Sequence, residues 1–233
     1  MLLEEAQWLG NELLTLSHHF KQPKLLNVGS GTTQKTVEVQ SHQEKLVLQP
    51  LRSHQVQTVN TDIEAGEGVD LVGDLTDLHF LEVLKAGQFN LVTCNNLLEH
   101  IDPIAPICNS FKAIVPQHGY LVVTVPYRYP YHPDPIDTMF RPSVRGIATL
   151  IDGFEVVKGD IINGSRHVYT PDGELRVERN YFQTLMNDKA YAVRLLLRSL
   201  LPFYKFKNWW NTVRYWPHLF SSYKVTCVVL RRV

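Results

Sequence analysis

Long apolar segments, cysteine pairs and an excess of one charge are all missing from this chain of 233 residues. No uninterrupted apolar segment approaches the roughly 20 residues that cross a bilayer, and the first residues carry acids where an export signal carries Lys or Arg. With 44% hydrophobic and 20% charged residues, the composition excludes collagen-like, disordered and disulfide-scaffold proteins. The sequence therefore predicts a globular protein that is not exported.

Cysteine and histidine are not arranged as disulfide or metal motifs require. Cys94, Cys108 and Cys227 lie inside apolar segments, so we expect buried small side chains in a reducing compartment. The ten histidines do not fall at metal-ligand spacing beside a cysteine or a carboxylate, so we expect no metal site. These features predict a cytoplasmic location.

The net charge is zero, but the charges are unevenly distributed. Residues 1–100 carry 13 acids and 6 bases, whereas residues 188–233 carry 1 acid and 9 bases. Such a gradient bears on the partners of a protein and not on its fold. The basic C-terminal segment is therefore a candidate contact surface.

Apolar segments of strand length alternate with helical patterns along most of the chain. Leucines at helical spacing predict an N-terminal helix within residues 1–22. The alternation predicts a single α/β domain, residues 1–233, around a doubly wound, mostly parallel seven-stranded sheet. Residues 32–55 show no clear pattern, and Pro126 is expected to end the fifth strand. We expect strands at 24–28, 56–63, 69–72, 91–94, 120–125, 153–157 and 223–230, and further helices at 104–115 and 142–151.

Residues 163–222 lie between the sixth and seventh predicted strands, and the sheet does not need them. A turn signal at 170–173 precedes a segment rich in leucine, aromatic and basic residues, so we expect a helical insertion. It could cover the sheet edge or form a homodimer, act as a lid over the acceptor, or contact a membrane surface through 195–217. Nucleic-acid contact is not favoured, because basic residues are too sparse.

Polar or acidic residues follow each of the first four predicted strands. The first strand ends in a turn with Gly29 and Gly31, and Asp62, Asp74 and Asn95 follow the next three. Open α/β sheets bind ligands at the carboxyl ends of their strands. A nicotinamide fingerprint would add a third glycine and an acid about 20 residues later. Here glutamine stands three residues after Gly31, and Asp62 lies 31 residues after it, so the nicotinamide reading is disfavoured.

From residue 24 to residue 157 the sequence resembles the class I S-adenosylmethionine-dependent methyltransferases. The resemblance is greatest to the small-molecule branch with an L-E-H motif after the fourth strand, here Leu98, Glu99 and His100. It implies S-adenosylmethionine as cofactor, with the glycine turn against its methionine half, an acid at its ribose and an acid–apolar pair at its adenine. The positions that match the family's cofactor-binding residues are Asn27, Gly29, Ser30, Gly31, Asp62, Ile63, Asp74, Leu75 and Asn95.

Residues 126–142 are dense in proline, tyrosine, arginine, histidine and aspartate, and a similar segment lines the acceptor pocket of related methyltransferases. An oxygen acceptor needs a general base with a pKa near neutral, which favours histidine. His132 is the first candidate and His100 the second, with Asp137 or Tyr127 supporting His132. The alternative is a rigid proline-rich loop held by an ion pair between Asp137 and Arg141.

Several of these residues also have a local structural interpretation. Asp62 could be a strand-end cap, Asp74 a helix N-cap, and His100 a structural residue at a helix start. The order of the four motifs favours ligand binding over these alternatives.

The residues and the resemblance together predict an enzyme that transfers a methyl group to a small or medium-sized acceptor. We expect an oxygen acceptor ahead of a nitrogen or carbon acceptor, and a saccharide- or lipid-linked acceptor fits the resemblance. Two positions depart from the family, since Asn27 replaces an acid and Thr33 replaces a frequent third glycine. They keep open an alternative, a methyltransferase-like binding module without turnover that acts through its basic aromatic insertion.

Overall fold

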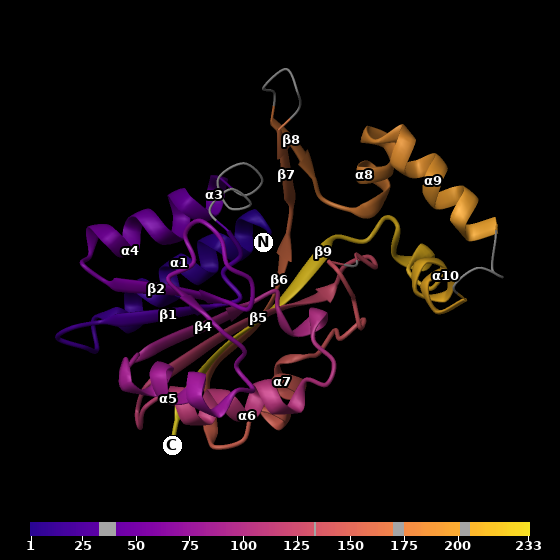
Figure 1. Ribbon diagram of the computed structural model, residues 1–233. Helices are drawn as coiled ribbons and strands as arrows, with labels where there is room; N and C mark the ends of the chain where they lie inside the picture. The colour runs from indigo at the N-terminus through magenta and orange to yellow at the C-terminus, as the bar shows by residue number, and fades with distance from the viewer. Residues whose placement is uncertain (33–40, 133, 170–174, 201–205) are drawn as a thin grey trace.

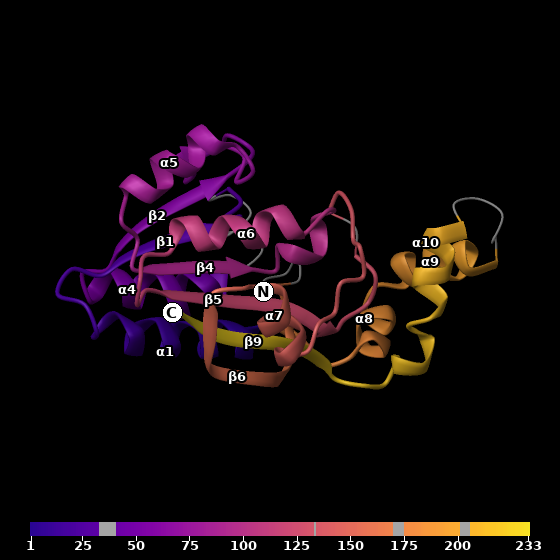
Figure 2. The ribbon, with the colours of Figure 1, turned by 90° about the horizontal axis from the view of Figure 1, so that it is seen from below.

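The computed structural model describes residues 1–32, 41–132, 134–169, 175–200 and 206–233. Its centre is a seven-stranded sheet with helices on both faces (Figures 1 and 2). The strands of this sheet are β1 (Lys24–Val28), β2 (Gln57–Asp62), β3 (Leu71–Val72), β4 (Leu91–Asn95), β5 (Tyr120–Arg128), β6 (Phe154–Gly164) and β9 (Tyr223–Arg232).

The strand order is β3-β2-β1-β4-β5-β9-β6, which confirms the predicted doubly wound sheet. Strands β1 to β5 pair in parallel, and β9 runs antiparallel between β5 and β6. The chain passes from β1 to β2 on one side and later returns to β4 on the other side of β1. This reversal is the topological switch point at which open α/β sheets bind ligands.

Helices cover both faces of the sheet (Figure 2), and a hydrophobic core lies between the sheet and each helical layer. Side chains alternate between the two faces of a strand, so Leu25 packs in one core and its neighbour Leu26 in the other. One face is covered by α1 (Leu3–Ser17) and α4 (Gln49–Ser53), and the other by α5 (Leu78–Ala86), α6 (Ala105–Ile114) and α7 (Val144–Leu150).

The prediction that Pro126 ends the fifth strand is wrong, because β5 continues to Arg128. Thr124 directs its carbonyl toward the β4 side, where it accepts from Asn96 N at 2.8 Å. Residues two apart on a strand direct their backbone groups the same way, so the nitrogen of Pro126 also faces that side. The pairing of β4 with β5 ends at Thr124, so the missing N–H of proline costs no ladder bond.

Within the unassigned segment 32–55, residues 41–53 are helical. The segment contains α3 (Ser41–Gln43), a π-helical turn (Glu44–Leu48) and α4. Thr33 and the alternating residues 36–40 lie outside the described residues.

The insertion begins with a two-stranded antiparallel sheet that the sequence analysis did not predict. This sheet pairs β7 (Arg166–Tyr169) with β8 (Leu175–Glu178), and the turn signal at 170–173 falls on undescribed residues between them. The expected helices follow, and Figure 1 shows them at one end of the central sheet. They are α8 (Tyr181–Asn187), α9 (Lys189–Leu200) and α10 (Phe206–Val213).

A third hydrophobic cluster joins the insertion to the end of the sheet. Tyr181 of α8, Leu195 of α9 and Tyr215 pack with Tyr223 and Val225 of β9. The insertion therefore belongs to the same packed unit as the sheet. In the described ranges, no helix has both the length and the apolar character needed to cross a membrane.

Glu5 of α1 is fully buried and connects three elements. Its Oε2 accepts from the backbone N–H of Leu2 at 2.9 Å, and its Oε1 accepts from Asn96 Nδ2 at 2.7 Å and from Thr124 Oγ1 at 2.6 Å. The carboxylate thus fastens the N-terminal helix to the residue after β4 and to the middle of β5.

We expect Glu5→Ala to lower the free energy of unfolding by about 2–4 kcal/mol, because three donors, two of them in buried hydrogen bonds, lose their acceptor. The matched control is Glu12→Ala on the same helix, which removes an ion pair with the exposed Lys158 and should cost less than about 1 kcal/mol. Urea denaturation of both variants measures the difference. Equal losses would show that Glu5 does not join these elements.

Candidate functional site

A cavity of about 880 Å³ opens at the carboxyl ends of β1, β2 and β4. Its size falls within the range of small-molecule sites, and it lies at the switch point of the sheet. His100 lines it together with all nine residues predicted to bind the cofactor, which are Asn27, Gly29, Ser30, Gly31, Asp62, Ile63, Asp74, Leu75 and Asn95.

The glycine turn after β1 has the backbone conformation that glycine permits. Gly29 and Gly31 have φ angles of 66° and 63°, in the left-handed region. Gly29 N donates to Thr61 O at 2.9 Å, which fixes the turn to β2. A Cβ on Gly29 would lie 2.8 Å from Leu97, whereas a Cβ on Gly31 would meet nothing within 4 Å. The turn is therefore held closely on one side and leaves open space beside Gly31.

Asp62 has a local role in addition to its place in the cavity. Its Oδ2 accepts from Gly31 N at 2.9 Å, and its Oδ1 accepts from Glu64 N at 3.1 Å. Each carboxylate oxygen has a further lone pair. The side chain that orders the glycine turn can therefore still accept two hydrogen bonds from a ligand.

Asp74 is not the cap of the helix that follows it. Its Oδ1 accepts from the backbone N and the Oγ1 of Thr76, both at 2.8 Å, whereas Asp77 caps α5 by accepting from Phe80 N. Leu75, the next residue, is buried in the hydrophobic core and also lines the cavity.

Ile63 adds an apolar surface to the lining of the cavity, since 67% of it is exposed. An exposed apolar side chain at a cavity wall is available for contact with a flat apolar ring.

Asn27 is engaged within the sheet. Its Nδ2 donates to Asn60 Oδ1, and its Oδ1 accepts from Thr93 Oγ1, both at 3.1 Å. The Oδ1 atom keeps a second lone pair, but the side chain brings no negative charge to the cavity. Asn95 is the last residue of β4, and its Oδ1 accepts a hydrogen bond from Thr124 Oγ1 at 3.2 Å.

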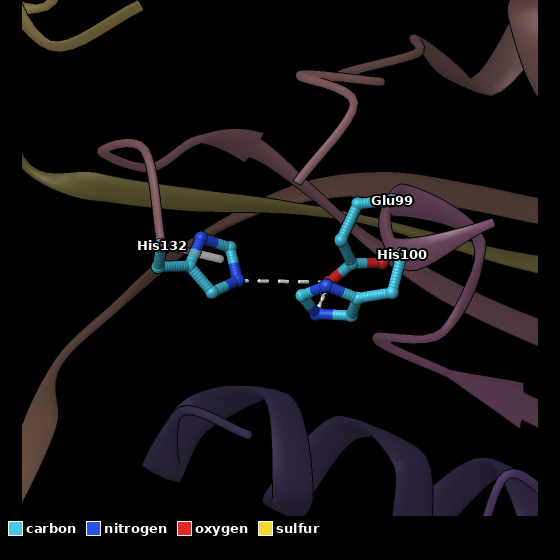
Figure 3. A group of neighbouring side chains, drawn as sticks. All are labelled: Glu99, His100 and His132. Carbon is cyan, nitrogen blue, oxygen red and sulfur yellow. Dashed lines mark ion pairs between the residues drawn. The ribbon is translucent and has the colours of Figure 1, made fainter. Parts of the chain in front are cut away.

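A buried carboxylate lies between two imidazoles beside the cavity (Figure 3). Glu99 is 0% exposed, and its Oε1 lies 3.7 Å from His100 Nε2 and 4.0 Å from His132 Nε2. Burial raises the pKa of Glu99 to about 7, and the nearby positive groups offset this only in part. Thr138 donates twice to the carbonyl of Glu99 and so joins the loop that carries His132 to this position.

The predicted ion pair between Asp137 and Arg141 is present and holds this loop. Arg141 donates to both carboxylate oxygens, at 2.7 and 3.1 Å, and His132 donates its backbone N–H at 3.0 Å. Burial would raise the pKa of Asp137, but the hydrogen bonds from His132 and Arg141 outweigh it and hold the pKa well below its usual range. Asp137 is therefore placed as a support and not as a proton acceptor.

The three predicted catalytic residues thus occupy different places. His100 lines the cavity, His132 lies beside it next to Glu99, and Asp137 lies behind His132. The sequence pattern identifies Glu99 only as part of the L-E-H motif. A glutamate directly before a histidine at the carboxyl end of a strand is the signal that could have identified it.

No model of a known protein family matches the chain, and no curated protein sequence matches it significantly. Solved structures do match. A candidate sarcosine dimethylglycine methyltransferase from Galdieria sulphuraria shares 14% identity over 98% of this chain and 85% of its own, with a TM-score of 0.54. A SAM-dependent methyltransferase from Archaeoglobus fulgidus shares 12% identity over 99% and 94%, with a TM-score of 0.51. The chain has the class I methyltransferase fold.

A third similar structure was determined with ligands. Coclaurine N-methyltransferase, bound to N-methylheliamine and SAH, shares 13% identity over 95% of this chain and 70% of its own, with a TM-score of 0.50. At such identities the similarity concerns the fold.

Replacing Arg141 by methionine should lower the free energy of unfolding by about 2–4 kcal/mol, because the buried Asp137 carboxylate would lose its cation. Arg145→Met, at an exposed position on the neighbouring α7, should change it by less than about 0.5 kcal/mol. Thermal or urea denaturation compares the two variants. A small effect of both would mean that the ion pair does not hold the loop.

Proposed function

We propose that the protein is an S-adenosylmethionine-dependent methyltransferase acting on a small or medium-sized acceptor. The observation that carries this proposal is the gathering of all nine predicted cofactor-binding residues around one cavity of the methyltransferase fold. When bound, S-adenosylmethionine supplies a methyl group already activated on a sulfonium sulfur. The protein then has to bind it, align the acceptor and exclude water.

The residues of the cavity fit the three parts of this cofactor. Ile63 and Leu75 offer apolar surface for the adenine, and Asp74 lies next to them. Asp62 offers two carboxylate oxygens to the two ribose hydroxyls. The glycine turn and Asn95 would hold the methionine half, with Asn27 as a neutral acceptor below it.

The acceptor would enter beside His100, where residues 134–136 also line the cavity. His100 Nδ1 lies 2.5 Å from the carbonyl of Ile136, which can only accept a hydrogen bond. The neutral ring therefore carries its proton on Nδ1, and the lone pair of Nε2, which lies 3.7 Å from Glu99 Oε1, can take a proton from a hydroxyl. A proton acceptor at this place favours an oxygen acceptor, and a saccharide- or lipid-linked alcohol fits that chemistry. A nitrogen acceptor is the second choice.

The alternative is a binding module without turnover that acts through the insertion. Asn27 brings no charge to the cavity, and the insertion exposes large apolar side chains. These side chains could cover the acceptor, form a homodimer or contact a membrane from the cytoplasm. They include Phe182, Val193, Leu196, Leu197, Trp210 and Phe220.

Calorimetric titration of S-adenosylhomocysteine into the purified protein tests the proposal. We expect Asp62→Ala to weaken binding by about tenfold or more, because two ribose hydroxyls lose their acceptor. Asp152→Ala is the control, since Asp152 lies far from the cavity in an exposed ion pair with Lys112, and it should bind like the wild type.

Each outcome separates the two functions. Binding that falls only in Asp62→Ala supports the methyltransferase. Absence of binding to the wild type would contradict it and favour the module. Equal binding by all three proteins would place the ligand elsewhere.

A further inference from the structure

We propose that Glu99, His100 and His132 form a binding site for a divalent transition-metal ion beside the acceptor end of the cavity. One ligand atom from each residue lies within 4.8 Å of the other two. Two of the three belong to consecutive residues after β4, and the third comes from the loop after β5 (Figure 3).

Both imidazoles are oriented as metal ligands by backbone carbonyls. His100 Nδ1 donates to Ile136 O at 2.5 Å, and His132 Nδ1 lies 3.0 Å from Pro130 O. Since a carbonyl only accepts, both rings carry their proton on Nδ1 when neutral. The lone pairs of both Nε2 atoms then lie on the side of Glu99. Metal-binding histidines are held in this way by a hydrogen bond from their other ring nitrogen.

Glu99 supplies the second, independent observation. Its side chain is fully buried, and in the part of the chain that the structure describes neither oxygen accepts a hydrogen bond from another residue. A buried carboxylate without a partner is costly unless a cation compensates it. The nearby guanidinium of Arg141 is occupied by Asp137. A cation between Glu99 and the two Nε2 atoms would satisfy the carboxylate.

The donor set indicates which metals fit. Two imidazoles and one carboxylate suit Zn²⁺ and the ions that resemble it, whereas Mg²⁺ and Ca²⁺ prefer oxygen ligands throughout. Ligand atoms around Zn²⁺ are about 3.4 Å apart when its bonds are about 2.1 Å long. The distances of 3.7 and 4.0 Å from Glu99 Oε1 to the two imidazoles are therefore close to those of a filled site.

Three protein ligands leave a fourth position open, as in catalytic zinc sites. If the proposed function holds, an acceptor hydroxyl could occupy that position and lose its proton more readily. The metal would then replace His100 as the group that activates the acceptor, because it uses the same lone pair. Metal binding itself does not depend on the proposed function.

Metal binding by the full chain tests the proposal. After treatment with a chelator and its removal, the protein is titrated with Zn²⁺ by calorimetry and with Co²⁺ by visible absorption. We expect about one tight site per chain in the wild type. Glu99→Gln and His132→Gln should each lower the affinity by about tenfold or more, with loss of the Co²⁺ bands. His79→Gln, at an exposed position on α5, should bind like the wild type.

The controls separate this proposal from the proposed function. Circular dichroism shows that each variant is folded, and Glu99→Gln keeps the shape of the side chain. Weak binding of Zn²⁺ by the wild type, or equal binding by all variants, would overturn the metal site. Binding of S-adenosylhomocysteine to the metal-free protein would then still support the methyltransferase. A tight Zn²⁺ site in a protein that does not bind S-adenosylhomocysteine would support the metal site and contradict the methyltransferase.

Discussion

The parallel pairing of β1 with both β2 and β4 is the constraint on which the candidate site depends. In this register Asn27 lies between Asn60 and Thr93, and its side-chain amide is hydrogen-bonded to both. The pairing brings the ends of the three strands to one edge of the sheet. The glycine turn, Asp62 and Asn95 lie around one cavity because of it.

The carboxylates in and beside this cavity differ in how their hydrogen bonds are satisfied. Asp62 lines the cavity, orders the glycine turn and keeps lone pairs that can accept from a ligand. Beside the cavity, Glu99 is buried without a hydrogen bond from any other described residue, while Asp137 accepts from His132 and Arg141. The well-satisfied carboxylate holds the loop, and the unsatisfied one belongs to the metal site that we propose.

The features that could be predicted from the sequence are those that depend on residues close together in the chain. The strands could be found because apolar segments of strand length alternate with helical patterns. The nine cavity residues could be found because their positions match the cofactor-binding residues of the family that the sequence resembles. The continuation of β5 through Pro126 could not be predicted from the sequence, because it depends on the residue at which β4 stops pairing with β5. The cluster of Glu99 with His132 also escaped prediction, since two residues distant in sequence meet only through a loop held by Asp137 and Arg141.

A crystal structure of the protein with S-adenosylhomocysteine tests the central claim most directly, which is that the cavity at the ends of β1, β2 and β4 holds the cofactor. The account predicts the adenine against Ile63 and Leu75 and both ribose hydroxyls within hydrogen-bond distance of the Asp62 carboxylate. A ligand bound outside this cavity, or bound in it without contact to Asp62, would contradict the account.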